Sequence, residues 1–210
     1  MYDQAKQSRL IDFARAGAGA TVIDVYPGGG GWTRIFSDVV GSAGQVYSFV
    51  PAEVAHFEND PVGLMRALAS EQGRENVHPV SANLVAMSDV AMPADVVWMH
   101  LFYHDLHTPL IQSKGATANA FNRAVYAALK PGGRYVIVDH AAASGSGTSD
   151  TQTLHRIDPQ VVVDEVQAAG FLLEAQGDML ANRDDGHKLR VFDSTIKGKT
   201  DRFAYRFIKP

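Results

Sequence analysis

Residues Thr21 to Thr33 read TVIDVYPGGGGWT, an apolar strand that runs into four consecutive glycines and then into a helix. Glycines at a strand-to-helix turn allow positive φ and let a ligand approach the backbone without meeting a Cβ. The following helix presents free N–H groups at its N-terminus. We therefore interpret this loop as a cradle for a flat, polar, adenosine-like ligand. The alternative is that the glycines serve only a tight turn.

The composition favours one compact domain over residues 1–210, with 46% hydrophobic and 20% charged residues. A net charge of −4 gives no general attraction to nucleic acid or to anionic membranes, so we expect neither as a partner. The absence of cysteine excludes disulfides, thiolate metal sites and cysteine nucleophiles. No apolar run has the length of a membrane span, and residues 1–6 are too polar for a signal peptide, so we expect a cytoplasmic protein. The oligomeric state is left open.

Strand and helix patterns alternate along the chain, which favours an α/β fold with a mostly parallel sheet covered on both faces. The segment 201–208 alternates polar and apolar residues, as expected of a strand exposed on one side. The other expected strands are 21–26, 45–50, 77–82, 95–99, 135–139 and 171–174, and the main expected helices are 53–72 with an interruption at Pro61, 116–129 and 159–169.

Histidines gather where the fourth and fifth expected strands end. Ligands of open α/β sheets bind beyond the carboxyl ends of the strands, which here means the segments after Met99 and Val138. The histidines in or near these segments are His100, His104, His107, His140 and His155. An imidazole titrates near neutral pH, so such a cluster suits a general base or a group that orients an acceptor. We expect His140, His104 and Tyr103 to face a substrate.

Each of these residues also has a structural interpretation. His107 is expected to be a solvated loop residue. A metal site formed by His100, His104, Asp105 and His140 is a further hypothesis, whereas our main interpretation includes no metal.

Two charged features nearby have alternatives of their own. Arg156 either binds an acidic group of the acceptor or pairs with Asp158 at a helix start. The charged stretch 182–188 is expected to be a solvated hairpin tip, and a cation bound by the pair Asp184 and Asp185 is the alternative.

Four landmarks in order resemble class I S-adenosylmethionine-dependent methyltransferases. They are the loop from Asp24 to Gly30, the strand at 94–99, the turn LKPGGR at 129–134 and the sequence AAGF at 168–171. More narrowly, FYHDL at 102–106 and VDH at 138–140 resemble a bacterial group of predicted methyltransferases that has no substrate to carry over. A dinucleotide fold fits less well, because Thr33 or Arg34 occupies the place of its third glycine.

The resemblance implies a Rossmann-like, seven-stranded sheet, mostly parallel with an antiparallel last strand and with helices on both faces. It also implies S-adenosylmethionine as the cofactor and methyl transfer to a small-molecule acceptor. The alternatives are a family member that binds the cofactor or a nucleoside without catalysis, and a His/Asp metalloenzyme on the same fold.

The resemblance further implies where the cofactor lies. Gly28 and Gly30, with Gly29 between them, would pass under its methionine and ribose portions, and Asp24 would support the loop or the amino group through water. Tyr26 departs from the family, because it stands in the place of the first loop glycine.

The end of the second strand departs as well. Val50, followed by Pro51, stands where the family has an acidic residue that binds the ribose. Glu53 is expected to reach round to that position. The alternative for Glu53 is that its carboxylate complements a helix dipole. Asn83 is expected at the adenine, with surface capping as its alternative. The full expected cofactor set is Asp24, Tyr26, Gly28, Gly29, Gly30, Val50, Pro51, Glu53, Asn83, Leu84 and His100.

Overall fold

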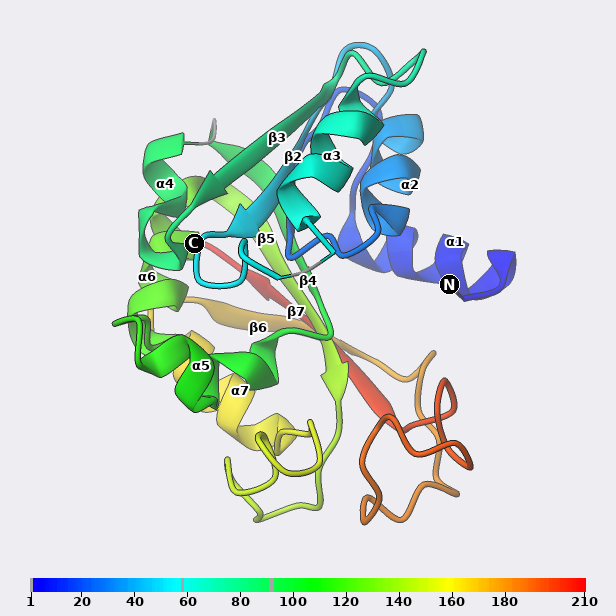
Figure 1. Ribbon diagram of the computed structural model, residues 1–210, viewed down its shortest axis with the longest axis vertical. Coiled ribbons are helices and arrows are strands. Elements are labelled where there is room, and N and C mark those ends of the chain that lie inside the picture. Colours follow the sequence, from blue (N-terminus) through cyan, green and yellow to red (C-terminus); the bar gives the residue numbers. More distant parts are fainter. Residues whose placement is uncertain (1, 58, 91–92) are drawn as a thin grey trace.

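The computed structural model describes residues 2–57, 59–90 and 93–210 and contains a seven-stranded sheet in the order β3-β2-β1-β4-β5-β7-β6 (Figure 1). The strands are β1 (Thr21–Val25), β2 (Gln45–Pro51), β3 (Val77–Ala82), β4 (Ala94–His100), β5 (Leu129–His140), β6 (Leu172–Gly177) and β7 (Arg202–Ile208). Strand β7 pairs antiparallel with both β5 and β6, whereas the pairs among β1 to β5 are parallel. This confirms the expected mostly parallel sheet with an antiparallel last strand.

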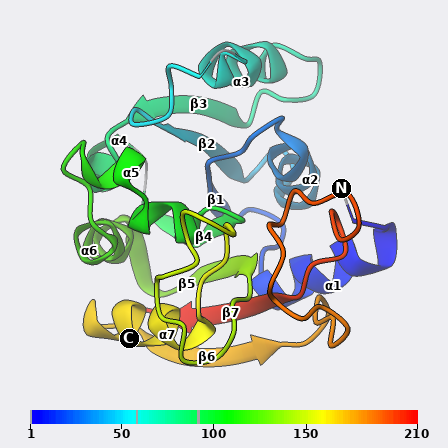
Figure 2. The same cartoon turned by 60° about the horizontal axis from the view of Figure 1, so that its bottom comes forward.

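Helices cover both faces of the sheet (Figures 1 and 2). One face packs against α1 (Gln4–Ala14), α2 (Gly31–Val40) and α3 (Pro61–Ala69), and the other against α4 (Met87–Val90), α6 (Ala118–Ala128) and α7 (Pro159–Ala168). The short elements are η1 (Leu84–Ala86), η2 (Tyr103–His107) and α5 (Pro109–Gln112). Side chains of β4 point alternately to the two faces of the sheet, so the strand contributes to both cores. Trp98 packs with the first helix layer and Met99 with the second.

The helix expected over 53–72 is wrong in its first half. Residues 52–57 form turns, and helix begins only at Pro61, where the side chain of Asp60 accepts from the backbone N–H of Gly63 at 2.9 Å. Proline has no N–H and is disfavoured after a helical residue, so it starts a helix well and continues one badly. The interruption expected at Pro61 is therefore the start of the helix.

The connections at the carboxyl ends of β4, β5 and β6 form one side of the molecule. They span residues 101–108, 141–158 and 178–201, and the last of these contains neither helix nor strand (Figure 2). Irregular connections of that length in a compact domain are usually functional or disordered. Among the helices of the described ranges, none combines the length and apolar character needed to cross a membrane.

Candidate active site

The glycine loop between β1 and α2 leaves part of its backbone bare. Tyr26, Gly28 and Gly30 take left-handed φ values of 54°, 55° and 77°. A Cβ added at Gly28 or Gly29 would meet no heavy atom within 4 Å, whereas one at Gly30 would lie 2.4 Å from Leu68 Cδ1. The first two glycines therefore leave room for a ligand, and Gly30 is required by the packing of α3.

The amides of this loop are also available. Within the part of the chain that the structure describes, the N–H groups of Gly28 and Gly29 donate to no protein acceptor, while that of Gly30 donates to the Pro27 carbonyl at 2.9 Å. Free amides at a helix N-terminus suit a polar or anionic ligand group.

Asp24 lies under the loop, at the end of β1. Its Oδ2 accepts from the Thr33 hydroxyl at 2.6 Å, and burial raises the pKa of the carboxyl to about 7 although the Thr33 bonds lower it. The structure thus places Asp24 as an internal link between β1 and α2.

The residues expected at the ribose and the adenine lie in different environments. Val50 and Pro51 are buried, and Asn83 is exposed. Glu53 is only 3% exposed, and its two carboxylate oxygens lie 3.0 and 3.2 Å from the backbone nitrogen of Leu84. Glu53 therefore ties the connection after β2 to the one after β3.

His100 is separated from the other histidines. Its Nε2 lies 3.0 Å from the Tyr2 hydroxyl, which accepts from Arg202 Nη1 at 2.8 Å, and its ring centroid is 5.8 Å from that of Trp32. Burial and the charge of Arg202 lower the pKa of His100 to about 3, so the ring is neutral. It belongs to the α1 and α2 side of the sheet.

A cavity of about 430 Å³ opens at the carboxyl ends of the strands. Its wall is apolar over most of its area and includes Tyr26, Val54, Phe57, Phe102, Ile111 and Phe192. One part of the wall is polar and consists of His104, Asp105, His140 and His155. The volume is that of a pocket for a small molecule.

Backbone strain concentrates at this cavity. Tyr26, Leu101 and His155 line it, and all three are non-glycine residues with φ between 54° and 59°. Such conformations cost roughly 1–3 kcal/mol each and are found mainly at functional sites. The Tyr26 ring stacks on Phe102, with centroids 4.5 Å apart and planes at 22°. Tyr26, which stands in place of the family's loop glycine, thus has a φ typical of glycine and forms part of the cavity wall.

His104 is held by a buried aspartate. Its Nδ1 lies 2.9 Å from Asp139 Oδ1, and its backbone N–H donates to Asp139 Oδ2 at 2.8 Å. An ionised carboxylate only accepts hydrogen bonds, so Nδ1 carries a proton. Burial lowers the pKa of His104, but the charge and hydrogen bond of Asp139, together with the charge of Asp105, outweigh it and raise the pKa to about 9. His104 is therefore an imidazolium at neutral pH, paired with the Asp139 carboxylate.

His140 lines the same cavity in a different state. Its Nδ1 lies 2.7 Å from Thr200 Oγ1, and its ring centroid is 6.2 Å from that of His104. Burial is the largest influence on its pKa, and together with the positive charge of Arg202 it outweighs Asp139 and lowers the pKa to about 3. The cavity thus pairs one charged with one neutral imidazole.

Comparison with solved structures relates this arrangement to known proteins. The neighbours include an S-adenosylmethionine-dependent methyltransferase from Aquifex aeolicus, at TM-score 0.65 and 16% identity over 97% of this chain and 89% of that one. A putative rRNA-methylase from Clostridium thermocellum matches at TM-score 0.61 and 15% identity over 100% and 99%. The chain has the methyltransferase fold.

A third neighbour shows that this fold also serves other functions. It is described as the [4+2]-cyclase SpnF and matches at TM-score 0.68 and 15% identity, over 98% of this chain and 81% of that one. No protein-family model matches the sequence, and a search of curated proteins finds no significant match. At these identities the fold is shared, and function has to be argued from the site.

Tyr103 lies behind the cavity wall of this methyltransferase fold. It is fully buried; its hydroxyl donates to Glu165 Oε2 at 2.8 Å and accepts from Asn122 Nδ2 at 2.8 Å. His107 Nε2 lies 3.1 Å from the same Glu165 oxygen, so His107 is not the solvated loop residue that we considered. The structure therefore does not bring Tyr103 to the cavity with His104 and His140.

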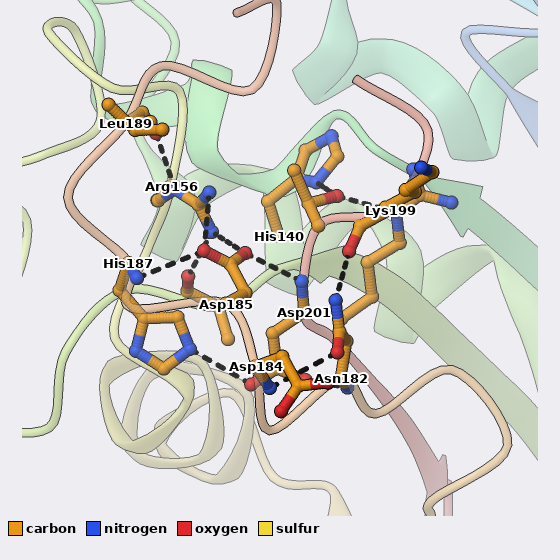
Figure 3. A network of polar contacts seen from close by, with 12 residues as sticks. His140, Arg156, Asn182, Asp184, Asp185, His187, Leu189, Lys199 and Asp201 are labelled. Carbon is orange, nitrogen blue, oxygen red and sulfur yellow. Dashed lines mark hydrogen bonds and ion pairs between the residues drawn. The ribbon is translucent and has the colours of Figure 1, made fainter. Parts of the chain in front are cut away.

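Arg156 is the centre of a buried polar network (Figure 3). The side chain is 0% exposed and donates to both oxygens of Asp185 at 2.8 and 3.2 Å. Asp185 also accepts from the backbone N–H of Asp201 at 2.7 Å and that of His187 at 3.0 Å. Arg156 therefore neither lines the cavity nor pairs with Asp158, and the expectation that 182–188 is a solvated hairpin tip is wrong at Asp185.

This network fixes a cavity wall that the sequence did not reveal. Segment 178–201 supplies Val191 and Phe192 to the wall, and segment 141–158 supplies His155. Arg156 of segment 141–158 joins the two segments, because besides its bonds to Asp185 its Nε donates to the Leu189 carbonyl at 3.0 Å. No periodicity marks Val191 or Phe192 as site residues; the only available signal was the length of the irregular segment itself.

Proposed function

We propose that this protein transfers a methyl group from S-adenosylmethionine to a small, mostly apolar acceptor bound in the cavity. One observation supports this above the others. The cavity contains both Tyr26, at the start of the bare glycine loop, and His104, which the buried Asp139 holds in a fixed orientation. A cofactor on the loop and an acceptor in the cavity would thus be neighbours.

The loop fits this cofactor in part. Gly28 and Gly29 offer open space and free amides, which suit a polar chain lying across them. The Glu53 carboxylate already accepts from the backbone N–H of Leu84, so it would have to bind a ribose hydroxyl and that N–H together. When bound, S-adenosylmethionine supplies an electrophilic methyl carbon on a sulfonium. The protein then has to place a nucleophile in line with that carbon and exclude water.

The acceptor side offers charge stabilisation. At neutral pH His104 is a cation, so its Nε2 donates toward the cavity and would stabilise an oxyanion on the acceptor. Asp139 keeps the ring oriented and balances its charge. His140, neutral and bound through Nδ1 to Thr200, would accept from or donate to a second polar atom of the acceptor. We assign Tyr103 a positioning role through Glu165.

The cavity indicates the kind of acceptor. An apolar wall with one charged imidazole suits a hydrophobic molecule that has one ionisable oxygen, such as a phenol or an enol. A net charge of −4 argues against an RNA acceptor, although one structural neighbour is described as a putative rRNA-methylase.

A second candidate function is binding, or another reaction, without methyl transfer. It is favoured by Tyr26 in place of the loop glycine, by the bonded Glu53, and by the [4+2]-cyclase among the neighbours. Cofactor binding without methylated product across a broad panel of phenols and enols would support this candidate over the first.

Calorimetry with S-adenosylmethionine and with its demethylated product tests cofactor binding. We expect micromolar affinity, and at least a tenfold loss in Gly29→Val, which fills the open space beside the loop. Gly17→Val is the matched control, because Gly17 also has no neighbour within 4 Å and lies before β1. No heat with either compound at millimolar concentration would remove the proposal. Mass spectrometry of the acceptor panel then tests transfer.

A further inference from the structure

The geometry points to a divalent transition-metal site formed by His104, Asp105 and His155 on the polar wall of the cavity. The inference deepens the proposed function, since an ion there would face the bound acceptor, but the site itself is argued from the ligands alone. It differs from the metal site considered from the sequence, because His100 and His140 take no part in it.

The three side chains converge from two connections. One ligand atom from each lies within 4.8 Å of the other two, and His104 Nε2 is 3.5 Å from Asp105 Oδ2. The rings of His104 and His155 meet edge to face, with centroids 5.4 Å apart. Within residues 2–57, 59–90 and 93–210, no other three histidines or acidic residues bring their ligand atoms this close.

Two imidazoles and one carboxylate form a recognised donor set. They suit zinc, iron(II), cobalt or manganese, whereas magnesium and calcium prefer oxygen ligands throughout. Three protein ligands leave coordination positions open, and here the open side is the 430 Å³ cavity. That is the arrangement of a reactive site, since a structural zinc site is normally closed by a fourth protein ligand.

A second carboxylate orients the first ligand. Asp139 binds His104 at Nδ1 and at the backbone, which directs Nε2 away from Asp139 and toward Asp105. A carboxylate behind a ligating histidine in this way is typical of metal sites, where it fixes the tautomer and raises the basicity of the ligand. The charges of Asp105 and Asp139 would together balance a dication.

The backbone presents His155 to the site. His155 adopts φ 56°, a conformation that a non-glycine residue rarely takes, and it is followed directly by the anchored Arg156. On the far side of Arg156, the N–H of Ile157 donates to the His140 carbonyl at 3.0 Å. A strained residue held by such anchors is expected where its side chain has a function.

An ion at this site would do the work that the proposed function gives to the His104 imidazolium. It would replace the proton on Nε2 and stabilise an acceptor oxygen as a Lewis acid. Asp105, His104 and His155 would then be ligands, and Asp139 a positioning residue that acts through His104.

Cobalt(II) titration of tag-free, chelator-treated protein tests the site without cofactor or acceptor. We expect visible d–d absorption that saturates at one equivalent, and a matching heat with zinc chloride. His155→Ala and Asp105→Asn should weaken binding at least tenfold, and Asp139→Asn, which changes only the outer shell, about 10–100-fold. His78→Asn on β3 is the control histidine and should bind as the parent does.

The outcomes separate this inference from the proposed function. No saturable cobalt spectrum, or unchanged binding in both His155→Ala and Asp105→Asn with native circular dichroism, would overturn the metal site and leave cofactor binding unaffected. Failure to bind S-adenosylmethionine, with one equivalent of cobalt still bound, would overturn the methyl-transfer proposal alone. Asp105→Asn is nearly isosteric, so it remains informative if His155→Ala does not fold.

Discussion

The glycine loop and the polar wall of the cavity are built in opposite ways. The loop is a continuous segment, and its internal link from Asp24 to Thr33 spans nine residues of the chain. In the wall, His104 pairs with Asp139 across 35 residues, and the network behind the wall pairs Arg156 with Asp185 across 29. The loop is thus specified by local backbone preferences, and the wall by the arrangement of the strands that bring distant connections together.

The difference assigns different tasks to the two regions. Local sequence shapes a loop whose free amides suit a polar ligand group. Tertiary contacts shape the wall, so the positions of its polar groups depend on how distant connections pack together. If this comparison is right, substitutions in the wall affect turnover and folding most strongly, and those beneath the loop mainly change how stability depends on pH.

The largest effect is expected from Asp139→Asn. The amide cannot balance the His104 imidazolium, and burial would then dominate and lower the pKa of His104 from about 9. We expect kcat to fall about 100- to 10,000-fold, with cofactor affinity nearly unchanged. In the parent, activity that needs the imidazolium is lost as pH rises through about 9, and in the variant this loss should move to lower pH.

Imidazole titration by NMR in metal-free protein, together with the pH profile of kcat, measures this effect. Asp12→Asn, at an exposed position on α1, serves as the control for the same substitution elsewhere. If the variant kept the parent's kcat and lost activity at the same high pH, the comparison between loop and wall would be wrong, because the polar wall would then have no special role in turnover.

The next effect is on stability and concerns Asp185→Ala. Removing one partner of a buried ion pair leaves an uncompensated charge, which costs about 3–5 kcal/mol of unfolding free energy. Arg156 would be that charge. Asp184→Ala is the matched control, since the neighbouring aspartate is exposed. Urea denaturation of both variants checks this, and equal midpoints would show that the network in Figure 3 does not hold segment 178–201 in place.

The same contrast explains what could be predicted from the sequence. Apolar runs were enough to predict that the strands exist and how they are layered, because alternation acts locally. The turn expected at 129–134 instead lies within β5 (Leu129–His140), whose register against β4 shifts between Ala94 and Val96. Tyr26, His104 and His140 were expected at a site, and they share the cavity wall. The partner of Arg156 and the place of Phe192 were not predictable, because an irregular segment has no period that indicates which side chains turn inward.

Asp24→Asn tests the prediction that a residue beneath the loop mainly changes how stability depends on pH. The pKa of Asp24 is higher in the folded than in the unfolded protein, so between about pH 4 and 7 the folded protein binds a proton that the unfolded chain has lost. The free energy of unfolding therefore falls as pH rises through this range. Asparagine still accepts from Thr33 and removes the charge, so the variant should be more stable at pH 8 by roughly 2–4 kcal/mol.

Thermal and urea unfolding of the parent and of Asp24→Asn between pH 4 and 8 measures this difference, with Asp12→Asn at an exposed position of α1 as control. If the two curves stay parallel across this range, Asp24 is ionised in the folded protein, and the loop then has a buried charge that a cofactor's cation would have to balance.

The smallest effect is expected where the wall meets solvent, at Phe192. The residue is 58% exposed, and its ring lies edge to face with that of His155, with centroids 4.9 Å apart. Phe192→Ala removes an acceptor contact without opening the core, so KM should rise about 3- to 10-fold while the unfolding free energy changes by less than about 0.5 kcal/mol.

Leu189→Ala is the matched control for Phe192→Ala, because Leu189 is exposed in the same segment and does not line the cavity. Steady-state kinetics on an accepted phenol or enol distinguishes two roles. A rise in KM alone places Phe192 in acceptor binding. A fall in kcat with unchanged KM would mean that Phe192 acts on His155, and the division between an apolar binding wall and a polar reacting wall would then be wrong at the point where the two meet.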